Sequence, residues 1–248
     1  MFTVDSLTER DIAKAIDHSL LRPELDDAFV DDGCRLALEY DVASVCVRPA
    51  DVMRAAAILA GSDVAVGTTI GFPHGNHRTE TKVFEAKQAL ADGATELDMV
   101  IEIGALKSGR DADVQTDIAE VVEVAHAAGA IVKVIFENAY LTDDEKIRAC
   151  RLSEAAGADF VKTSTGFAPG GATHDDLRLM RANTSPHIGV KAAGGVRTLD
   201  ALLEVMALGT TRIGATATKA IIDDFRARKS GATPLAAPVA TSAVEGGY

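Results

Sequence analysis

Two lysines end two short apolar runs in the second half of the sequence. The run ADFVKTSTG carries Lys162 into a turn of small residues, and IGVKAAGGV carries Lys191 into another. A strand buried on both faces rarely holds an ammonium group, because burying an unpaired charge is costly. The separation of 191 − 162 = 29 residues fits one helix between the two strands, which predicts that they are neighbours. Neighbouring strands lie about 4.8 Å apart, so the two amines can meet in one site.

Two amines in one site predict nucleophilic chemistry. Each disfavours protonation of the other, and a lysine that loses its proton near neutral pH is a nucleophile. Other apolar runs carry Asp17, Asp98, Lys133 and Glu137, which adds groups for proton transfer. The alternative is a structural ion-pair network in which the lysines neutralise these carboxylates. Two lysines that each precede a small-residue turn and share a cavity with a carboxylate favour chemistry.

The apolar runs also predict the architecture that positions these groups. Strands are expected at residues 15–20, 44–47, 64–70, 96–101, 131–136, 160–162, 188–192 and 212–215. Segments with helical spacing, such as 27–40 and 80–91, lie between them, and Thr142 with Glu145 forms a capping-box pattern. Glycines that can end a helix in the left-handed conformation precede several strands. They are Gly93, Gly129, Gly157 and Gly209.

Eight such units in 248 residues predict an α/β fold, a (β/α)₈ TIM barrel. A doubly wound open sheet is the alternative, although no GxGxxG follows the first strand. We expect one barrel domain over 1–229, a short helix over 6–15 before the first strand, and a flexible tail over 230–248, whose composition is rich in Ala, Pro, Gly and Ser. Three helical lysines are expected on solvated faces: Lys82, Lys87 and Lys146.

In a barrel of this type the active site lies at the carboxyl ends of the strands. Alternate strands contribute to one interior layer, so Asp98 is expected level with Lys162, and Lys133 level with Lys191. Glycine turns after the last three strands predict a phosphate cradle built from backbone N–H groups, although each turn alone can be merely a tight connection. The cradle residues are Gly166, Gly194, Gly195, Gly214 and Ala215, with Arg197 as an added cation.

Composition limits the kinds of binding partner and the cellular compartment to be expected for the protein. The net charge of 25 − 37 = −12 argues against nucleic acid or an anionic membrane as the main partner. Three scattered cysteines, without a secretory signal or a membrane-spanning stretch, predict a cytoplasmic protein. His74 and His77 lack a ligand set that would complete a metal site, and Cys46 is expected to be a core residue.

Eight motifs occur in a characteristic order: IDHSLL, SVCVRPADV, GTTIGFPHG, ELDMVI, KVIFE, ADFVKTSTGF, GVKAAGGVRT and RIGA. In these motifs, and over nearly the whole chain, the sequence resembles the deoxyribose-phosphate aldolases. The resemblance implies a class I aldolase on a TIM barrel, independent of metal and cofactor and often dimeric. Such an enzyme reversibly cleaves 2-deoxy-D-ribose 5-phosphate to D-glyceraldehyde 3-phosphate and acetaldehyde, in deoxyribose phosphate catabolism.

The resemblance also implies roles for residues. Lys162 corresponds to the Schiff-base lysine, Lys191 to the second lysine, Asp98 to the proton-relay acid and Thr165 to a residue near the substrate hydroxyl. The cradle residues named above correspond to the phosphate rim. Three further residues are accessory candidates: Asp17, Lys133 and Tyr248, the last because some members end in a tyrosine that reaches the site.

Two departures from the family pattern concern the phosphate. Phe167 stands where some members have a lysine, and Thr216-Ala217 stand where some have two serines. Weaker discrimination against unphosphorylated aldehydes is therefore expected. Two other functions remain open: a barrel isomerase or synthase that uses lysine and aspartate as base and acid, and a catalytically silent protein that binds a sugar phosphate.

Overall fold

Eight parallel strands form a closed barrel in the computed structural model, which describes residues 2–231. Each strand pairs with the next in the sequence, and β8 pairs with β1. The strands are β1 Ile16–Leu20, β2 Ser44–Val47, β3 Ala65–Ile70, β4 Glu96–Val100, β5 Ile131–Ile135, β6 Phe160–Lys162, β7 Gly189–Ala193 and β8 Arg212–Ala215. The predicted barrel is confirmed, the open sheet is excluded, and strand ends differ from the prediction by no more than about one residue.

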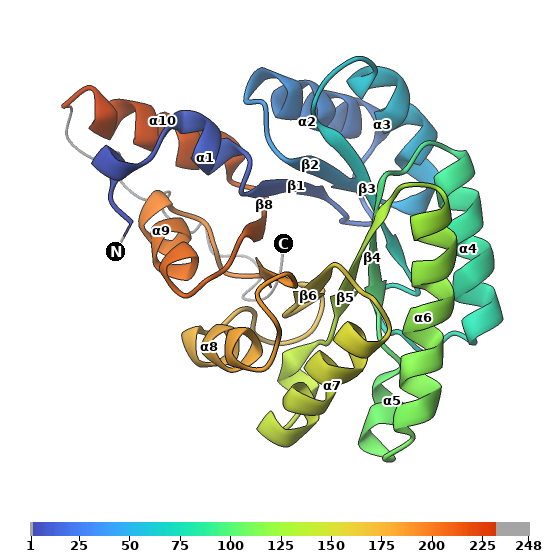
Figure 1. The fold of residues 1–248 in the computed structure, drawn as a ribbon. Helices are drawn as coiled ribbons and strands as arrows, with labels where there is room; N and C mark the ends of the chain where they lie inside the picture. Colours follow the sequence, from blue (N-terminus) through green and yellow to red (C-terminus); the bar gives the residue numbers. More distant parts are fainter. Residues whose placement is uncertain (1, 232–248) are drawn as a thin grey trace.

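Helices surround the strands when the molecule is viewed along the barrel axis (Figure 1). They are α1 Glu9–Ala13, α2 Asp27–Glu39, α3 Val52–Leu59, α4 Thr79–Ala91, α5 Ile103–Lys107, α6 Asp111–Ala127, α7 Asp143–Ala155, α8 His174–Ala182, α9 Leu199–Ala207 and α10 Thr218–Lys229. Short 3₁₀ helices cover Val4–Ser6, Pro49–Asp51 and Asn138–Tyr140. In place of the helix expected over 6–15, the chain forms the first 3₁₀ turn followed by α1, which packs beside α10.

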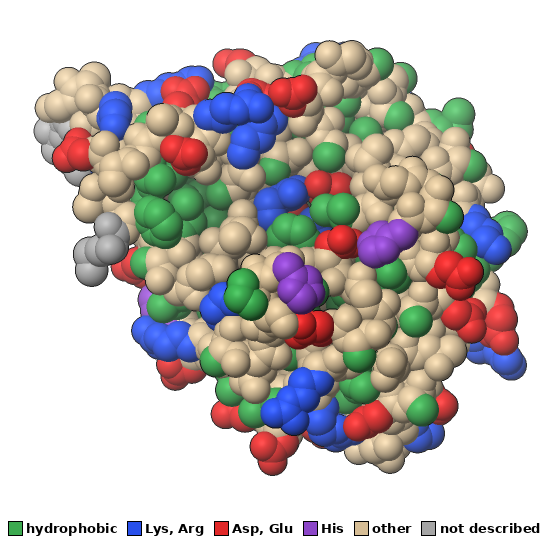
Figure 2. All heavy atoms as spheres, viewed as in Figure 1, with side chains coloured by type: hydrophobic (Ala, Val, Ile, Leu, Met, Phe, Trp, Pro, Cys, Tyr) green, Lys and Arg blue, Asp and Glu red, His purple; other side chains and the backbone are tan. Residues whose placement is uncertain are grey.

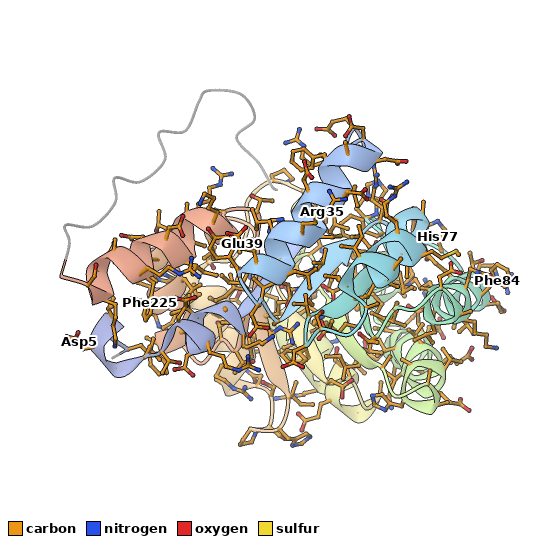
Figure 3. The ribbon with its side chains drawn as sticks, turned by 90° about the horizontal axis from the view of Figure 1, so that it is seen from above. Asp5, Arg35, Glu39, His77, Phe84 and Phe225 are labelled. Carbon is orange, nitrogen blue, oxygen red and sulfur yellow. The ribbon has the colours of Figure 1, made fainter. Side chains whose placement is uncertain are left out.

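Local sequence explains where these helices begin and end. At the start of α7, the side chain of Thr142 accepts a hydrogen bond from Glu145 N, and the Glu145 carboxylate accepts one from Thr142 N, as the capping box predicts. Gly93 follows α4 with φ = +108°, the left-handed stop expected there. On α2, Cys34 is buried while Arg35 and Glu39 are exposed, so the helix covers the barrel with one face (Figure 3).

Two of the three helical lysines predicted to be solvated are buried. Lys82 on α4 is fully buried. Its charge is tolerated there because its Nζ lies 2.5 Å from Asp117 on α6 and donates a hydrogen bond to the carbonyl of Val100 at 2.9 Å. Lys146 on α7 is buried as well and lies 2.7 Å from Asp176 on α8. Lys87 is exposed, as predicted. The partners come from neighbouring helices, which helical spacing within one segment does not reveal.

The predicted tail begins at residue 230, and α10 ends at Lys229. Residues 232–248, and with them Tyr248, lie outside the described residues. Between residues 2 and 231, no helix is both long and apolar enough to cross a membrane.

Candidate active site

The two strand-end lysines lie directly opposite each other. Strands β6 and β7 pair in a register that places Lys162 across from Lys191, as their spacing predicted. Both side chains are buried inside the barrel. Asp98, which projects from β4, accepts a hydrogen bond on Oδ2 from each Nζ atom, at 2.7 Å in both cases. One carboxylate oxygen therefore bridges two amines.

A wider network lies beneath this bridge. Lys133 on β5 contacts Asp98 Oδ1 at 2.8 Å and Glu96 at 2.6 Å, and Asp17 on β1 lies 2.5 Å from Lys191. Arg212 on β8 reaches both Asp17 at 2.5 Å and Glu96 at 2.7 Å. Asp98 and Lys162 were predicted to share one layer of the barrel interior, and they are in direct contact. Lys133 and Lys191 were predicted to share another layer, and both lie near Asp17 Oδ2, at 3.6 and 2.5 Å.

Glu96 and Arg212 were not among the predicted site residues. The sequence carried a signal for Glu96, which is two positions before Asp98 on the same strand and therefore faces the same side. Together these side chains form what we call the barrel charge cluster: Asp17, Glu96, Asp98, Lys133, Lys162, Lys191 and Arg212.

The charges in the cluster set one another's protonation. Burial alone would raise the pKa of Asp98, but the ammonium groups of the three lysines hold it well below its usual range. Burial would likewise lower the pKa of Lys191, but the carboxylates of Asp17 and Asp98 raise it above its ordinary value. The pKa of Lys133 is raised for the same reason. These two lysines are therefore held in the ammonium form.

Glu137 lies outside this cluster. In the alternative of a purely structural network a lysine neutralises Glu137, whereas the hydrogen-bond partner that the structure gives its carboxylate is Thr165. It follows β5 with φ = +57°, a left-handed conformation that is rare for a residue with a side chain. Its Oε2 accepts hydrogen bonds from the hydroxyl of Thr165 and, at 3.2 Å, from the amide of Thr165.

Turns after β6 and β7 touch each other. Gly166 and Gly194 have φ of +87° and +79°, which favours glycine at both positions. A Cβ atom on Gly171 would lie 2.6 Å from the carbonyl oxygen of Gly194, and Ala172 N donates to the carbonyls of Ala193 and Gly194 at 3.0 and 3.1 Å. The loops that carry two parts of the predicted cradle are therefore joined by their backbones.

The predicted cradle continues at β8. Gly214 and Ala215 end this strand, and α10 starts three residues later, at Thr218, without a side-chain cap on its first turn. Uncapped N–H groups at a helix start are suited to bind an anion. Gly195 and Arg197 are exposed after β7. A cavity of about 510 Å³ lies beside the end of β8, lined by Thr216 and otherwise by residues of β1, the following loop and α2, such as His18 and Phe29; none of the predicted cradle residues lines it.

An aromatic pair lies next to the turn after β6. The ring of Phe167, 43% exposed, packs edge-on against Phe72 at 5.3 Å between centroids. Figure 2 shows histidine side chains near the centre of one face, with charged side chains around them. Cys46 is buried on β2, as expected, and burial raises its pKa to about 11. No group of three metal-ligating residues occurs in the part of the chain that the structure describes.

Comparison of the sequence with known protein families shows to which family the chain belongs. The sequence pattern of the DeoC/LacD family aldolases matches residues 12–231. The chain belongs to this family. It is therefore an aldolase, as the resemblance in its motifs predicted.

Relatives of this DeoC/LacD aldolase include a deoxyribose-phosphate aldolase from Rhodopirellula baltica, 53% identical over 87% of this chain and 90% of the relative. Another from Bacillus cytotoxicus is 54% identical over 85% of this chain and 94% of the relative. Among solved structures, one described as a putative deoxyribose-phosphate aldolase from Coccidioides immitis superposes with a TM-score of 0.83 at 42% identity, covering 89% of this chain and 87% of that one.

A further relative shares the fold and is described together with its oligomeric state. The tetrameric deoxyribose phosphate aldolase from Aeropyrum pernix superposes with a TM-score of 0.83 at 30% identity, covering 91% of this chain and 95% of that one. These likenesses extend over nearly the full barrel of the DeoC/LacD aldolase. They therefore concern the whole fold and not one motif.

Proposed function

We propose that this aldolase reversibly cleaves 2-deoxy-D-ribose 5-phosphate to D-glyceraldehyde 3-phosphate and acetaldehyde through a Schiff base on Lys162. The observation that carries the proposal is the single oxygen of Asp98 that lies 2.7 Å from both Lys162 and Lys191. The names of relatives that are more than half identical support the choice of substrate.

Charge balance supports a neutral Lys162. The cluster holds four cations, the three lysines and Arg212, against three carboxylates, Asp17, Glu96 and Asp98. A surplus charge in a buried cluster is unfavourable, so the loss of one proton relieves it. Carboxylates raise the pKa of Lys133, Lys191 and Arg212, which keeps those three groups charged. Lys162 is then the group that supplies the neutral amine.

Covalent catalysis follows from that amine. Lys162 Nζ attacks the C1 aldehyde, and loss of water from the carbinolamine gives a protonated imine. As the C2–C3 bond breaks, the C3 hydroxyl gives its proton to a base in the site and its O–H electron pair forms the C=O bond of D-glyceraldehyde 3-phosphate. The C2–C3 electron pair moves into the imine and leaves an enamine on Lys162. Protonation at C2 and hydrolysis then release acetaldehyde and restore the amine.

Asp98 and Lys191 are suited to move protons during these steps. Asp98 is held ionised by its lysine neighbours and lies within hydrogen-bond distance of the reacting nitrogen. Lys191, held as an ammonium, can return protons to the carbinolamine hydroxyl as water leaves. Asp17 and Lys133 are accessory in this scheme, since they contact Lys191 and Asp98 and fix their charges. The predicted role of Tyr248 lies outside the described residues.

Phosphate is proposed to bind at the rim of β6, β7 and β8. Backbone N–H groups of Gly166, Gly194, Gly195, Gly214 and Ala215 would hold it, together with the uncapped start of α10 and the cation of Arg197. Phe167 offers an apolar ring where some members of the family have a lysine. Binding therefore depends mainly on backbone donors, which agrees with the expected modest discrimination against unphosphorylated sugars.

The cellular setting is proposed on the same basis. A cytoplasmic role in deoxyribose phosphate catabolism fits a small phosphorylated substrate and three free cysteines. We also propose a homo-oligomer. A dimer was expected from the resemblance, and the Aeropyrum pernix relative is described as tetrameric.

Trapping with borohydride tests the proposed chemistry. Incubation with acetaldehyde and sodium borohydride is expected to reduce the imine and add one ethyl group to Lys162, detected by peptide mass spectrometry. Lys162→Ala should abolish both turnover and the adduct, and Lys191→Ala should lower turnover severely while the barrel still folds. An isomerase acting by acid–base chemistry alone, or a silent binding protein, would give no adduct on the wild-type chain, and that result would refute the proposal.

A further inference from the structure

Glu137 and Thr165 form a buried hydrogen-bonded pair that the chemistry above does not use. Glu137 is 3% exposed and Thr165 is fully buried, and both lie at the carboxyl ends of their strands, β5 and β6. The left-handed backbone at Glu137 is costly for a residue with a side chain, and such strain is concentrated at functional sites. Thr165 is three residues after Lys162, so the pair lies at the mouth above the reacting lysine.

The hydrogen bonds fix what the hydroxyl of Thr165 can do. Its proton is donated to Glu137 Oε2, and its oxygen accepts from the amide of Phe167 at 3.0 Å. A hydroxyl has one proton and two lone pairs, so one lone pair is left. Thr165 can therefore only accept a further hydrogen bond, and its partner must be a group that carries a proton, such as a substrate hydroxyl.

We propose, resting on the function proposed above, that Thr165 and Glu137 together remove the proton of the substrate's C3 hydroxyl as the C2–C3 bond breaks. The C3 oxygen gives its proton to Thr165 Oγ1, and the former Thr165 proton passes to Glu137 Oε2. The O–H electron pair forms the new C=O bond, and the C2–C3 pair moves into the imine. In the direction of synthesis the same path returns the proton from Glu137 to the alkoxide. Thr165 is the catalytic residue of this pair, and Glu137 is the positioning residue that holds the proton.

The surroundings of Glu137 suit a temporary proton acceptor. Burial raises the pKa of its carboxyl, while hydrogen bonds from Thr165 and the charges of Lys162 on β6 and His74 in the β3–α4 loop oppose the shift. A carboxyl with a raised pKa accepts and releases a proton more readily near neutral pH than an ordinary glutamate.

Glu137→Gln tests the proposal, because glutamine still accepts the hydrogen bond of Thr165 but cannot take its proton. The donor half of the reaction, which has no C3 hydroxyl, gives two readouts: borohydride trapping of acetaldehyde on Lys162, and exchange of the acetaldehyde methyl hydrogens in D₂O. We expect both to match the wild type, while cleavage of 2-deoxy-D-ribose 5-phosphate slows by about 100-fold. Thr165→Val should show the same selective loss, and Thr165→Ser should retain most of the cleavage rate.

A matched control comes from Glu154, which accepts hydrogen bonds from the hydroxyl and, at 3.2 Å, the amide of Ser185 at the other end of the barrel. Glu154→Gln should leave all three rates unchanged. Equal losses of trapping, exchange and cleavage in Glu137→Gln and Thr165→Val would indicate a structural role and overturn the proposal, as would an unchanged cleavage rate. Absence of trapping in the wild-type chain would instead refute the imine chemistry itself.

Discussion

Replacing Asp98 with asparagine tests whether the barrel charge cluster acts as one electrostatic unit. Asp98 is fully buried and accepts hydrogen bonds from three lysines, Lys133, Lys162 and Lys191, at 2.7–2.8 Å. Asparagine has nearly the same shape but no charge. With Lys162 neutral, as proposed above, the variant cluster holds three cations against two carboxylates, so its net charge rises from zero to one positive charge.

The expected loss of stability follows from this imbalance. Removing one partner of a buried ion pair costs about 3–5 kcal/mol, and each kcal/mol lowers the Tm of a domain of this size by about 2–4 °C. The Tm of Asp98→Asn should therefore fall by about 6–20 °C near neutral pH. Turnover should fall by at least about 100-fold, because the group next to the reacting nitrogen no longer accepts a proton.

The pH dependence gives the sharper result. In the wild type, the raised pKa of Lys133 and Lys191 provides stability that is present below about pH 10.4 and lost as the pH rises further. In Asp98→Asn the lysines are under-neutralised, so their folded-state pKa falls below the unfolded value. Folding then releases protons, and stability should rise with pH between about 7 and 10.

Chemical denaturation at several pH values measures both slopes. Asp117→Asn is the matched control, since Asp117 also pairs with a buried lysine, Lys82, but outside the barrel interior. It should lose stability and keep activity close to that of the wild type at temperatures where it is folded. If Asp98→Asn shows the wild-type Tm, or if its stability declines between pH 7 and 10, the charge-balance reasoning is wrong.

Three further predictions concern the rim, the loops and the thiols. Phe167→Lys should raise the preference for deoxyribose 5-phosphate over deoxyribose by about tenfold, measured as a ratio of kcat/KM values, because a charge-assisted contact replaces an apolar ring; an unchanged ratio would place the phosphate elsewhere. Gly171→Ala should raise KM for the phosphorylated substrate, since a Cβ there would lie 2.6 Å from the carbonyl oxygen of Gly194; a wild-type KM would mean that the two loops move independently. Cys46 should resist iodoacetamide at pH 8 in the folded protein, because a pKa of about 11 leaves about one thiol in 1,000 ionised; rapid labelling would contradict its burial.

The fold was predictable because the apolar runs and the helix-ending glycines all indicated the same repeated strand–helix pattern. Apolar runs located all eight strands, and glycines such as Gly93 and Gly157 ended helices with positive φ as expected. The register of Lys162 opposite Lys191 followed from their separation by one helix-containing unit. Lys82 and Lys146 were wrongly placed in solvent, because helical periodicity reports the face of a helix but not a carboxylate on the next one.

Only those site residues whose charge is unusual on a buried strand could be predicted from the sequence. Asp98 and the two lysines stand out since charged residues are rare on buried parallel strands. Arg212 escaped notice because it opens a strand, where a charged residue is ordinary, and only barrel closure brings it to Asp17. The pairing of Glu137 with Thr165 depends on the left-handed backbone conformation of Glu137 itself. The residues around Glu137 in the sequence do not predict that conformation.

The amino-terminal end of the barrel interior is filled. The ring of Phe160 lies where a side chain on Gly189 would be, 2.2 Å from a Cβ built at that position, and the guanidinium of Arg212 lies 5.9 Å from the centre of that ring. Among the described residues, these side chains therefore block the barrel interior at the end opposite the carboxyl ends of the strands. Under the proposed mechanism, D-glyceraldehyde 3-phosphate is the fragment nearer the mouth and leaves first, while the two-carbon fragment stays bonded to Lys162 deeper in the barrel until the imine is hydrolysed.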